Sequence, residues 1–191
     1  NSSTVTLSLA ATDDSGTVSQ MQCSNDDVTY SAPEAYATTK SWALPTGDGL
    51  KTVYVTFKDA AGNWSAATSD TIVLDTTPPQ LSTMSSSGVG STSATITWTT
   101  NESSTSQVEY GTTTSYGQLS ALDATLVTSH RVSLSGLTAA TAYHYRVRSK
   151  DAAGNEALSA DATFTTAPPP DMTPPSGTVT INGGAAYTTT T

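Results

Sequence analysis

The feature that most constrains the fold is an alternation of apolar with polar residues at every second position. Val5–Leu9, Val53–Phe57 and Tyr143–Val147 show it clearly, and these runs are rich in Val, Thr or aromatic residues. Side chains of a β-strand point alternately to its two faces, so this pattern is typical of half-buried strands. Turn signals such as Gly47–Gly49 separate the runs. The sequence therefore predicts an all-β protein built from antiparallel sandwiches.

Two phrases occur twice and indicate two domains of similar length. Lys58–Asn63 recurs word for word as Lys150–Asn155, and each copy follows an aromatic strand, as expected for the tip of a domain's last hairpin. Asp75–Pro79 is echoed by Asp171–Pro175, and paired prolines stiffen an extended linker. The spacing of the copies suits a sandwich of about 100 residues. We therefore expect a sandwich over 1–75, a linker over 76–79, a sandwich over 80–167, a Pro-rich linker over 168–175 and a lone strand over 176–191.

The last residues are too few for a domain, and we expect them to supply a strand to another one. Its residues are Thr178, Val179, Thr180 and Ile181, followed by a turn at Asn182–Gly184 and a Thr-rich extension. The first sandwich reaches its Val5–Leu9 strand with no opening strand before it. Joining the tail to the N-terminus restores the length of the other sandwich. The tail strand is thus expected to complete the first domain of the next copy, in a head-to-tail contact that does not close.

Two arrangements satisfy this expectation, and identical copies are the partners in both. The sequence is one period of a covalent tandem array, or separate subunits exchange their tail strands. The array is favoured because the joined sequence runs from Thr191 into Asn1 without interruption. Denaturing electrophoresis separates the two, since a uniform band near 20 kDa would refute the array.

Read in the joined order, the first domain resembles a bacterial immunoglobulin-like repeat of secreted and surface proteins. The residues that carry this resemblance are Ile181–Tyr187, Val18–Asp26, Trp42, Gly47–Val55, the Lys58–Asn63 turn and the Asp75–Pro79 exit. Cys23 stands where such repeats often have Phe, so this position is atypical. The resemblance implies an immunoglobulin-like sandwich with Trp42 as a structural core residue.

The second domain resembles a fibronectin type III module, of the subtype also found beside metallophosphatase and other secreted hydrolase domains. Trp98 takes the place of the core tryptophan, and Val108–Gly111 form the following strand. Leu134–Leu137 then lead into Thr141–Tyr143, which makes Tyr143 the expected corner tyrosine. Modules of both kinds serve as spacers in unrelated proteins, so the resemblance specifies the fold more than the function.

Composition excludes several classes of function. A formal net charge of −9 leaves no basic field for a nucleic-acid backbone. No apolar run reaches the ~20 residues that span a bilayer, so the chain is not expected to be membrane-embedded. Charged residues make up only 12% of a Thr-rich sequence, which favours an extracellular or cell-surface location. The single Cys23 excludes an internal disulfide framework, and we expect a buried thiol, with pairing to another chain as the alternative.

The sequence predicts neither an enzyme nor a bound organic cofactor. Its only histidines, His130 and His144, lie beside no nucleophile in a recognisable motif. His144 alternates with Tyr143 and Tyr145, so we expect it on the outer face with the neighbouring arginines. His144 is therefore interpreted as a surface residue.

Calcium is the one metal that the sequence suggests. Asp59 and Asp151 lie on hairpin tips, whereas Asp75 and Asp171 lie at the linkers. Hard cations bind several converging carboxylate and carbonyl oxygens, and some bacterial immunoglobulin-like adhesins resemble this arrangement. The alternative is that Asp59 and Asp151 cap their own turns.

Exposed aromatic residues suggest a second partner, a surface polysaccharide. Trp64, Tyr30, Tyr36 and Tyr116 flank loops, although packing at the rim of the core is the commoner fate of such residues. The function expected first is a structural repeat of an extracellular bacterial filament, stalk or adhesin shaft. The alternative is a non-catalytic spacer or carbohydrate-binding region of a secreted hydrolase.

Overall fold

The computed structural model describes residues 2–14, 16–181 and 184, and within them it confirms the all-β fold class. The first group of strands comprises β1 (Thr4–Ser8), β2 (Val18–Ser24), β3 (Glu34–Ala35), β4 (Thr39–Ala43), β5 (Gly49–Asp59) and β6 (Thr68–Leu74). The second comprises β7 (Leu81–Ser87), β8 (Ser93–Gly111), β9 (Gln118–Leu119), β10 (Asp123–Ser135), β11 (Ala142–Lys150), β12 (Glu156–Leu158) and β13 (Ala162–Thr165). Within the described ranges, no helix is long and apolar enough to cross a bilayer.

The first group forms two antiparallel sheets with a small core between them. One sheet holds β1 and β4, and the other has the order β3-β2-β5-β6. Alternate positions of these strands meet between the sheets because successive side chains point to opposite faces. The buried core consists of Cys23, Leu44, Val53 and Val55, with Val5, Leu7, Leu9, Trp42 and Phe57 packed against it.

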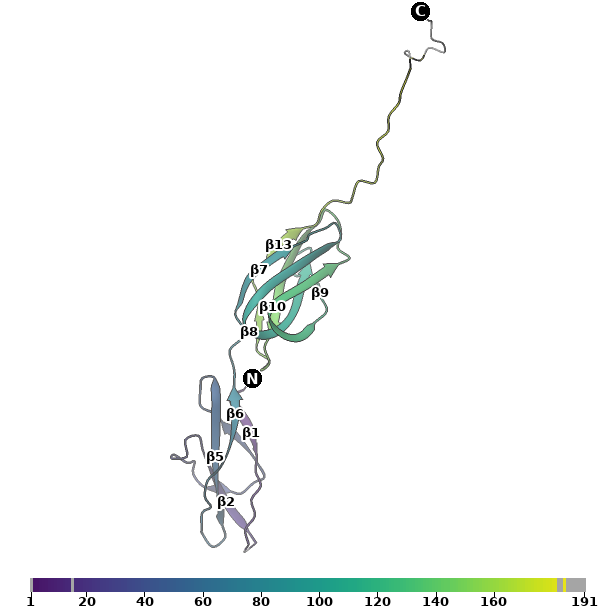
Figure 1. Ribbon diagram of the computed structural model, residues 1–191. Coiled ribbons are helices and arrows are strands. Elements are labelled where there is room, and N and C mark those ends of the chain that lie inside the picture. Colours follow the sequence, from purple (N-terminus) through teal and green to yellow (C-terminus); the bar gives the residue numbers. More distant parts are fainter. Residues whose placement is uncertain (1, 15, 182–183, 185–191) are drawn as a thin grey trace, which may run out of the picture.

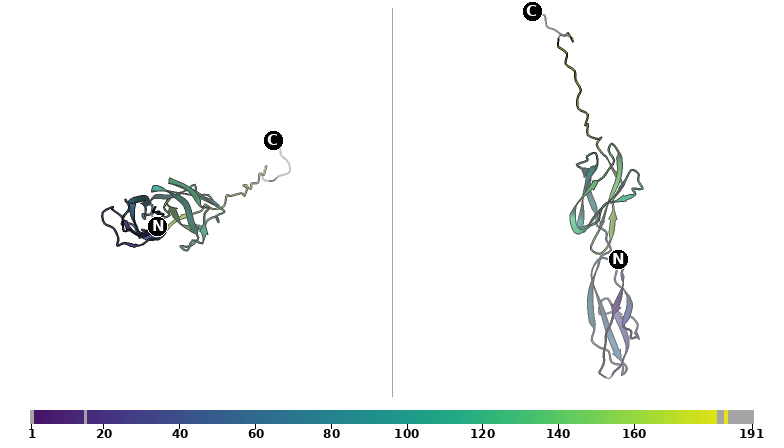
Figure 2. Two further views of the ribbon diagram at one scale, coloured as in Figure 1. Left: turned by 90° about the horizontal axis from the view of Figure 1, so that it is seen from below. Right: turned by 90° about the vertical axis from the view of Figure 1, so that its right-hand side faces the viewer.

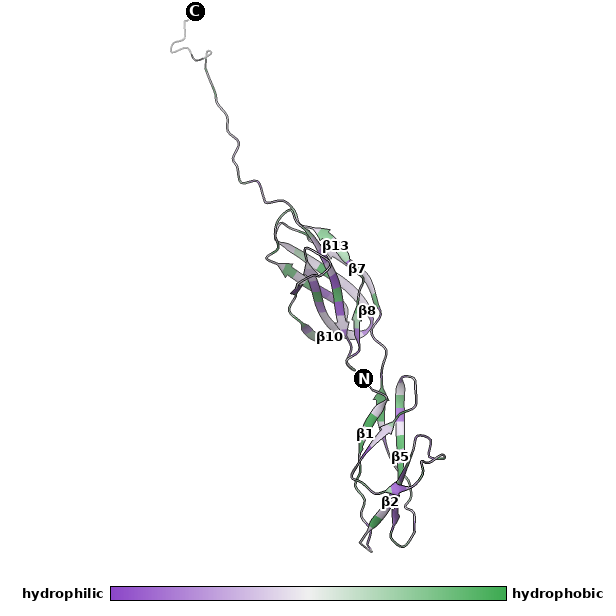
Figure 3. Cartoon of the chain, turned by 180° about the vertical axis from the view of Figure 1, so that it is seen from behind, coloured by the Kyte–Doolittle hydropathy of each residue, from purple (hydrophilic) through white to green (hydrophobic). Residues whose placement is uncertain are grey.

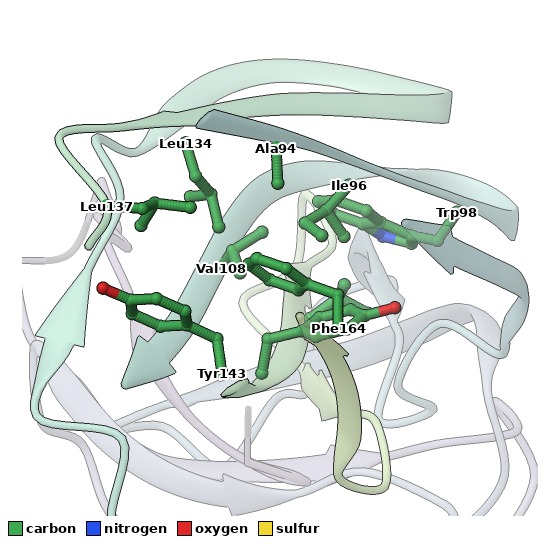
Figure 4. Close-up of a cluster of buried hydrophobic side chains, with 10 residues drawn as sticks. Ala94, Ile96, Trp98, Val108, Leu134, Leu137, Tyr143 and Phe164 are labelled. Carbon is green, nitrogen blue, oxygen red and sulfur yellow. The ribbon is translucent and has the colours of Figure 1, made fainter. Parts of the chain in front are cut away.

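The second group is built around the long strand β8, which belongs to both of its sheets. The first part of β8 pairs with β7 and β10, whereas its last residues pair with β9 and β11. Strand β11 also pairs with β12 and β13. Side chains from both sheets fill the space between them (Figure 4), and the buried set is Ala94, Ile96, Trp98, Val108, Leu134, Leu137, Tyr143, Tyr145, Val147 and Phe164.

The two groups share one pairing scheme with a single difference. β1 pairs with β4 as the first part of β8 pairs with β10, and β2 pairs with β5 as the second part of β8 pairs with β11. β3 and β9, and likewise β6 and the β12–β13 pair, hold equivalent positions. β7, which flanks the first part of β8, has no counterpart beside β1 in the described part of the chain.

The two groups lie end to end, and the Pro78–Pro79 segment connects them (Figures 1 and 2). Beyond β13 the chain continues as an extended segment that projects away from both groups. The backbone coloured by hydropathy shows green residues on β1, β5 and β6 of the first group (Figure 3). In the first group, β1 and β6 are the end strands of their sheets among the described residues, so the sandwich has an open edge between them.

Candidate functional site

An apolar groove opens between β1 and β6, the edge strands of the two sheets of the first group. Its volume is about 500 Å³. Residues 5–10 form one wall and residues 68–72 the other, while Val53, Val55 and Phe57 of β5 lie at its base. The groove therefore exposes the interior of a sandwich along one side.

On the groove side, β1 has no strand neighbour in the part of the chain that the structure describes. The Leu9 N–H donates to Thr38 O at 2.8 Å, and the Leu44 N–H donates to Ser3 O at 2.7 Å, which places Ser3 and Leu9 in hydrogen-bonded pairs with the β4 side. Such pairs alternate along an antiparallel ladder. The N–H and C=O groups of Thr6 and Ser8 consequently point away from β4, toward the open edge.

The β6 wall contributes side chains that would face a core if the groove were filled. Asp70 and Thr68 lie opposite Val53 and Val55 in the ladder, so they share the inward face of the sheet. Ile72 lies on the same face and is 46% exposed. A charged side chain that points inward on an edge strand is a known device against unwanted strand pairing.

The predicted tail strand is extended but belongs to no ladder. Residues Thr178–Ile181 form no strand with any described residue. The side chains of Val179 and Ile181 are 89% and 75% exposed. Of the predicted turn and extension, residues 182–183 and 185–191 lie outside the described residues. The predicted strand was expected to pair with the first domain of another copy, so it stays a prediction.

The linker between the two groups is hydrogen-bonded from both sides. Asp48, in the turn before β5, accepts hydrogen bonds from the Thr76 N–H and the Thr76 hydroxyl, each at 2.7 Å, and from the Thr77 hydroxyl. These bonds lower the pKa of Asp48, and the Thr77 hydroxyl contributes most. From the second group, the Asn155 side-chain amide donates to Asp75 O at 3.2 Å and to Thr77 O at 3.4 Å.

An acidic cluster lies at the same junction. Carboxylate oxygens of Asp75, Glu102 and Asp151 are within 4.8 Å of one another. Partial burial, followed by the charges of Asp75, Asp151 and Asp48, raises the pKa of Glu102. Glu102 was not predicted from the sequence, because no repeated phrase contains it and its approach to the linker depends on the path of β8 between the two sheets.

The repeated hairpin tips have the same geometry. The Asn63 N–H and side-chain amide donate to the two carboxylate oxygens of Asp59, each at 2.8 Å, and Asn155 makes the same two bonds to Asp151, also at 2.8 Å. Gly62 and Gly154 adopt φ values of 100° and 93°, which favour glycine. Both aspartates therefore cap their own turns.

The structure brings together only two of the four aspartates considered for calcium, Asp75 and Asp151. Asp59 lies at the other end of β5, and Asp171 accepts a bond from the Thr173 N–H in the Pro-rich segment. The Asn155 amide occupies part of the space between the acidic oxygens, since it donates to Asp75 Oδ1 at 3.3 Å and to Asp151. Asp75, Glu102 and Asp151 each offer a carboxylate to this cluster, whereas calcium takes six to eight oxygen ligands, so further carbonyl or water oxygens would have to complete a site. Calcium binding stays a prediction.

The residues proposed for the core have different environments. Trp98 is buried and donates from Nε1 to Ser149 Oγ at 3.0 Å. The hydroxyl of buried Tyr143 accepts a bond from the Thr138 N–H at 3.0 Å, which ties the corner together. Trp42 is only half-buried, and its Nε1 donates to Asn25 Oδ1 at 2.8 Å. Trp42 therefore lies on β4 at the margin of its core, where it packs against the buried residues without being one of them.

His130 is a buried residue, which the sequence did not predict. Its ring stacks on Trp98 at 4.7 Å, Nδ1 lies 2.8 Å from Ser106 Oγ and Nε2 lies 2.9 Å from Thr100 Oγ1. Burial lowers the pKa of His130. His144 is half-buried and pairs with Asp161 at 2.8 Å. Both rings thus have structural partners.

Cys23 is fully buried, as expected, and burial raises the pKa of its thiol. A buried thiol with a raised pKa is a poor nucleophile because the thiolate is the reactive form.

The aromatic residues considered for polysaccharide binding lie on four different loops. Tyr36 packs edge-on against Phe57 at 5.8 Å, and Tyr116 lies under the Arg146 guanidinium at 4.9 Å. The Tyr30 hydroxyl donates to Asp27, which raises the pKa of Tyr30 to about 12. Trp64 remains 39% exposed, with the Lys58 ammonium 5.6 Å from its ring. Trp64 is thus the most accessible of the four.

Two curated proteins are similar to parts of this chain. Endoglucanase B of Cellulomonas fimi is 42% identical over 128 residues, which cover 61% of this chain and 12% of the relative. Exoglucanase B of the same species is 43% identical over 105 residues, which cover 53% of this chain and 9% of the relative. The chain thus matches only about a tenth of the length of each glucanase.

Domain and structure comparisons agree with the fold. A family model described as the N-terminal domain of purple acid phosphatase matches residues 78–166, which contain β7–β13. The crystal structure of domains A168–A170 from titin has a TM-score of 0.52 and 16% identity, with coverage of 86% of this chain and 58% of that chain. At this identity the likeness shows a shared β-sandwich fold and nothing about function.

Proposed function

We propose that this chain is a non-catalytic spacer region of an extracellular glucan hydrolase. The observation that carries the proposal is the identity of 42% and 43% to segments of two glucanases. Because these segments are a small share of either relative, an accessory role beside a separate catalytic domain is favoured. A family model named for a domain that precedes a phosphatase supports the same role for residues 78–166.

The geometry favours a spacer over a carbohydrate-binding surface. The two groups of strands lie end to end, and Asp48 and Asn155 hold the linker between them. The four aromatic residues lie on separate loops, and only Trp64 among them is exposed, so little aromatic surface is available for stacking on a sugar. In this proposal residues 80–167 form a fibronectin type III module and residues 1–75 an immunoglobulin-like module.

The filament, stalk or adhesin shaft expected first from the sequence draws no support from these relatives. Their names favour the alternative, a region of a hydrolase. Head-to-tail contact between identical copies stays a prediction.

A two-part experiment tests the proposed function. The purified chain should neither hydrolyse soluble glucan nor be depleted from solution by insoluble glucan. In the full-length gene product, removal of residues 1–191 should leave hydrolysis of soluble glucan unchanged and lower hydrolysis of insoluble glucan. Hydrolysis by the chain itself, or a full-length product without glucan hydrolase activity, would overturn the proposal. Depletion by insoluble glucan would replace the spacer role with a binding role, for which Trp64→Ala is the first variant to test.

A further inference from the structure

We propose that His130 is a proton-sensitive support of a bulge in β8, and that its protonation releases the contacts between that bulge and Gln80, where the linker enters β7. The bulge comprises Thr100–Ser103, where β8 passes from one sheet to the other. The proposal stands apart from the proposed function, because it concerns how the joint between the two groups of strands responds to acid.

The bulge is a weakly paired part of β8. In the register of β8 with β10, Ser129 lies opposite Thr99, and Val127 lies opposite Ser104. The bulge residues between Thr99 and Ser104 therefore have no partner in β10. Pairing of β8 with β7 also ends at Thr100. Because extra residues disrupt a ladder locally, the bulge depends on side-chain hydrogen bonds for its position.

His130 of β10 bridges the two sides of the bulge. Its Nε2 lies 2.9 Å from Thr100 Oγ1, where the bulge begins, and its Nδ1 lies 2.8 Å from Ser106 Oγ, beyond the end of the bulge. The residue is 2% exposed, and its ring stacks on Trp98 with an angle of 8° between the two planes. The stacking and the two hydrogen bonds hold the ring in one orientation. His130 thus fixes the separation of Thr100 and Ser106.

The hydrogen bonds of Thr100 assign the position of the proton on the ring. The Thr100 hydroxyl donates its single hydrogen to Glu102 O at 2.7 Å, and it accepts one from the Ser104 hydroxyl at 3.2 Å. Since this hydrogen is already used, Nε2 of His130 is the donor toward Thr100 Oγ1. Nδ1 then carries no proton and accepts a hydrogen bond from the Ser106 hydroxyl. A neutral ring with its hydrogen on Nε2 therefore fits both neighbours.

The bulge also holds the end of the linker. The Asn101 side-chain oxygen accepts the Gln80 N–H at 2.7 Å, and the Asn101 N–H donates to Gln80 O at 3.3 Å. Asn101 lies between Thr100, which His130 supports, and Glu102, whose carbonyl accepts from Thr100. A displacement of Thr100 would therefore move both neighbours of Asn101, and with them the two bonds to Gln80.

Acid would break this network at Nδ1 of His130. A second proton there turns an acceptor into a donor, so the Ser106 hydroxyl would have to turn its own hydrogen away. The positive charge would also lie in the core, and burial accordingly lowers the pKa of His130. Release of the ring from its site relieves both costs.

Charged groups approach this network from three segments. Asp123, near the start of β10, opposes the effect of burial on the pKa of His130. Glu102 lies in the bulge of β8, and Asp151, which follows β11, is bridged to Ser104. All three are acidic, so their charges favour the protonated ring and do not account for a lowered pKa. Burial is therefore the cause that resists protonation.

The expected response to acid is a local opening of the bulge. Once the ring is released, it takes up a proton near the ordinary histidine pKa of about 6.5, whereas the buried ring does so less readily. Acidification from pH 7.5 to 5.5 should therefore raise the population of the open form by up to about tenfold. The ladders of β8 with β7 and β11 do not involve the ring, so they should persist in the open form.

Amide hydrogen exchange of the full chain, followed residue by residue by NMR at pH 7.5 and 5.5, tests the proposal. Protection factors, which correct for the pH dependence of intrinsic exchange, should fall several-fold and at most about tenfold at Asn101 and Gln80. Tyr145 in the middle of β11 should keep its protection. Thr76, whose N–H is bound to Asp48 of the first group, should also keep it.

Three variants identify the group that takes up the proton. His130→Gln is neutral at both pH values and should lose the response at Gln80. His144→Gln should respond like the wild type. Glu102→Gln should also retain the response, which separates the histidine from the acidic cluster.

A measurement on the wild type covers the case in which His130→Gln does not fold. Imidazole nitrogen shifts should place the hydrogen of His130 on Nε2 at pH 7.5. Protection at Gln80 should begin to decline below about pH 6.5, well above the ordinary glutamate range near 4.5. An equal decline at Tyr145, a decline that starts only near pH 4.5, or a response that persists in His130→Gln would each overturn the proposal. Glucan hydrolysis plays no part in these readouts, so failure here leaves the proposed function untouched.

Discussion

At the scale of single residues, His130 shows how the second core accommodates a polar ring. Its two nitrogens are bonded to Ser106 and Thr100, and its face stacks on Trp98. Protonation would turn the nitrogen that accepts a hydrogen bond into a donor and would place a charge in the core. The lowered pKa of His130 expresses that cost, with burial as its largest cause and the charge of Asp123 opposing it.

His130 should therefore make stability depend on pH near neutrality. The unfolded chain takes up the proton near the ordinary histidine pKa of about 6.5, before the folded chain does. The stabilisation from the neutral ring is complete above about pH 6.5 and is lost as the pH falls toward the folded pKa. Urea unfolding at pH 7.5 and 5.5 should show this loss in the wild type and in the His144→Gln control. His130→Gln should be less stable at pH 7.5 and should show a smaller loss on acidification; an unchanged loss would contradict the assignment.

Glu102 should have the opposite pH dependence. Its folded pKa is raised, so the folded chain binds the proton more readily than the unfolded chain, and the charged form is penalised at high pH. Glu102→Gln is expected to raise the melting temperature at pH 7, and this gain should shrink as the pH falls toward about 4.5, the ordinary range of a glutamate. Equal melting temperatures at pH 7 would refute the penalty.

A rise in the wild-type melting temperature on addition of calcium, absent from Glu102→Gln, would support the calcium prediction.

At the scale of strands and turns, the alternation in the sequence was a reliable guide where a strand buries one face, as β5, β8 and β11 do. The repeated Asp–Asn tips were also readable, since the same six residues form the same hydrogen bonds in both places. The continuity of β8 across two sheets was not readable, because Thr100–Ser103 lie in a polar Thr-, Asn- and Ser-rich stretch that is typical of a loop. That continuity places Glu102 beside the linker.

The corner at Tyr143 gives a prediction at this scale. Its hydroxyl accepts the Thr138 N–H, and its ring stacks on Phe164 at 5.5 Å. Tyr143→Phe keeps the ring but leaves that N–H without its acceptor, which typically costs about 1–3 kcal/mol. Urea unfolding should show a loss in this range, whereas Tyr143→Ala should lose more because it also opens a cavity. Unchanged stability of Tyr143→Phe would show that the corner bond is dispensable.

At the scale of the whole molecule, the linker determines how the two groups of strands move relative to each other. Thr76 and Thr77 are bound to Asp48 of the first group, while Asn155 of the second group donates to Asp75 and Thr77. Proline restricts the following Pro78–Pro79 segment, and Pro79 is buried. Hydrogen bonds to the backbone on both sides of a short linker should limit bending, which is the property that a spacer requires.

The repeated hairpin tip provides a matched test of this rigidity. Asn155→Ala removes the side-chain bond to Asp151 together with the bonds to Asp75 and Thr77, whereas Asn63→Ala removes only the equivalent bond to Asp59. Because the two turns have the same geometry, the difference between the variants isolates the contribution of the linker contacts. Small-angle scattering should show a broader distribution of overall dimensions for Asn155→Ala, while Asn63→Ala should match the wild type. The Asn155 variant should also lose more thermal stability, since the Asp75 and Asp151 carboxylates would lose the side-chain amide that donates to both. Equal scattering profiles for the two variants would show that the prolines alone keep the groups of strands in line.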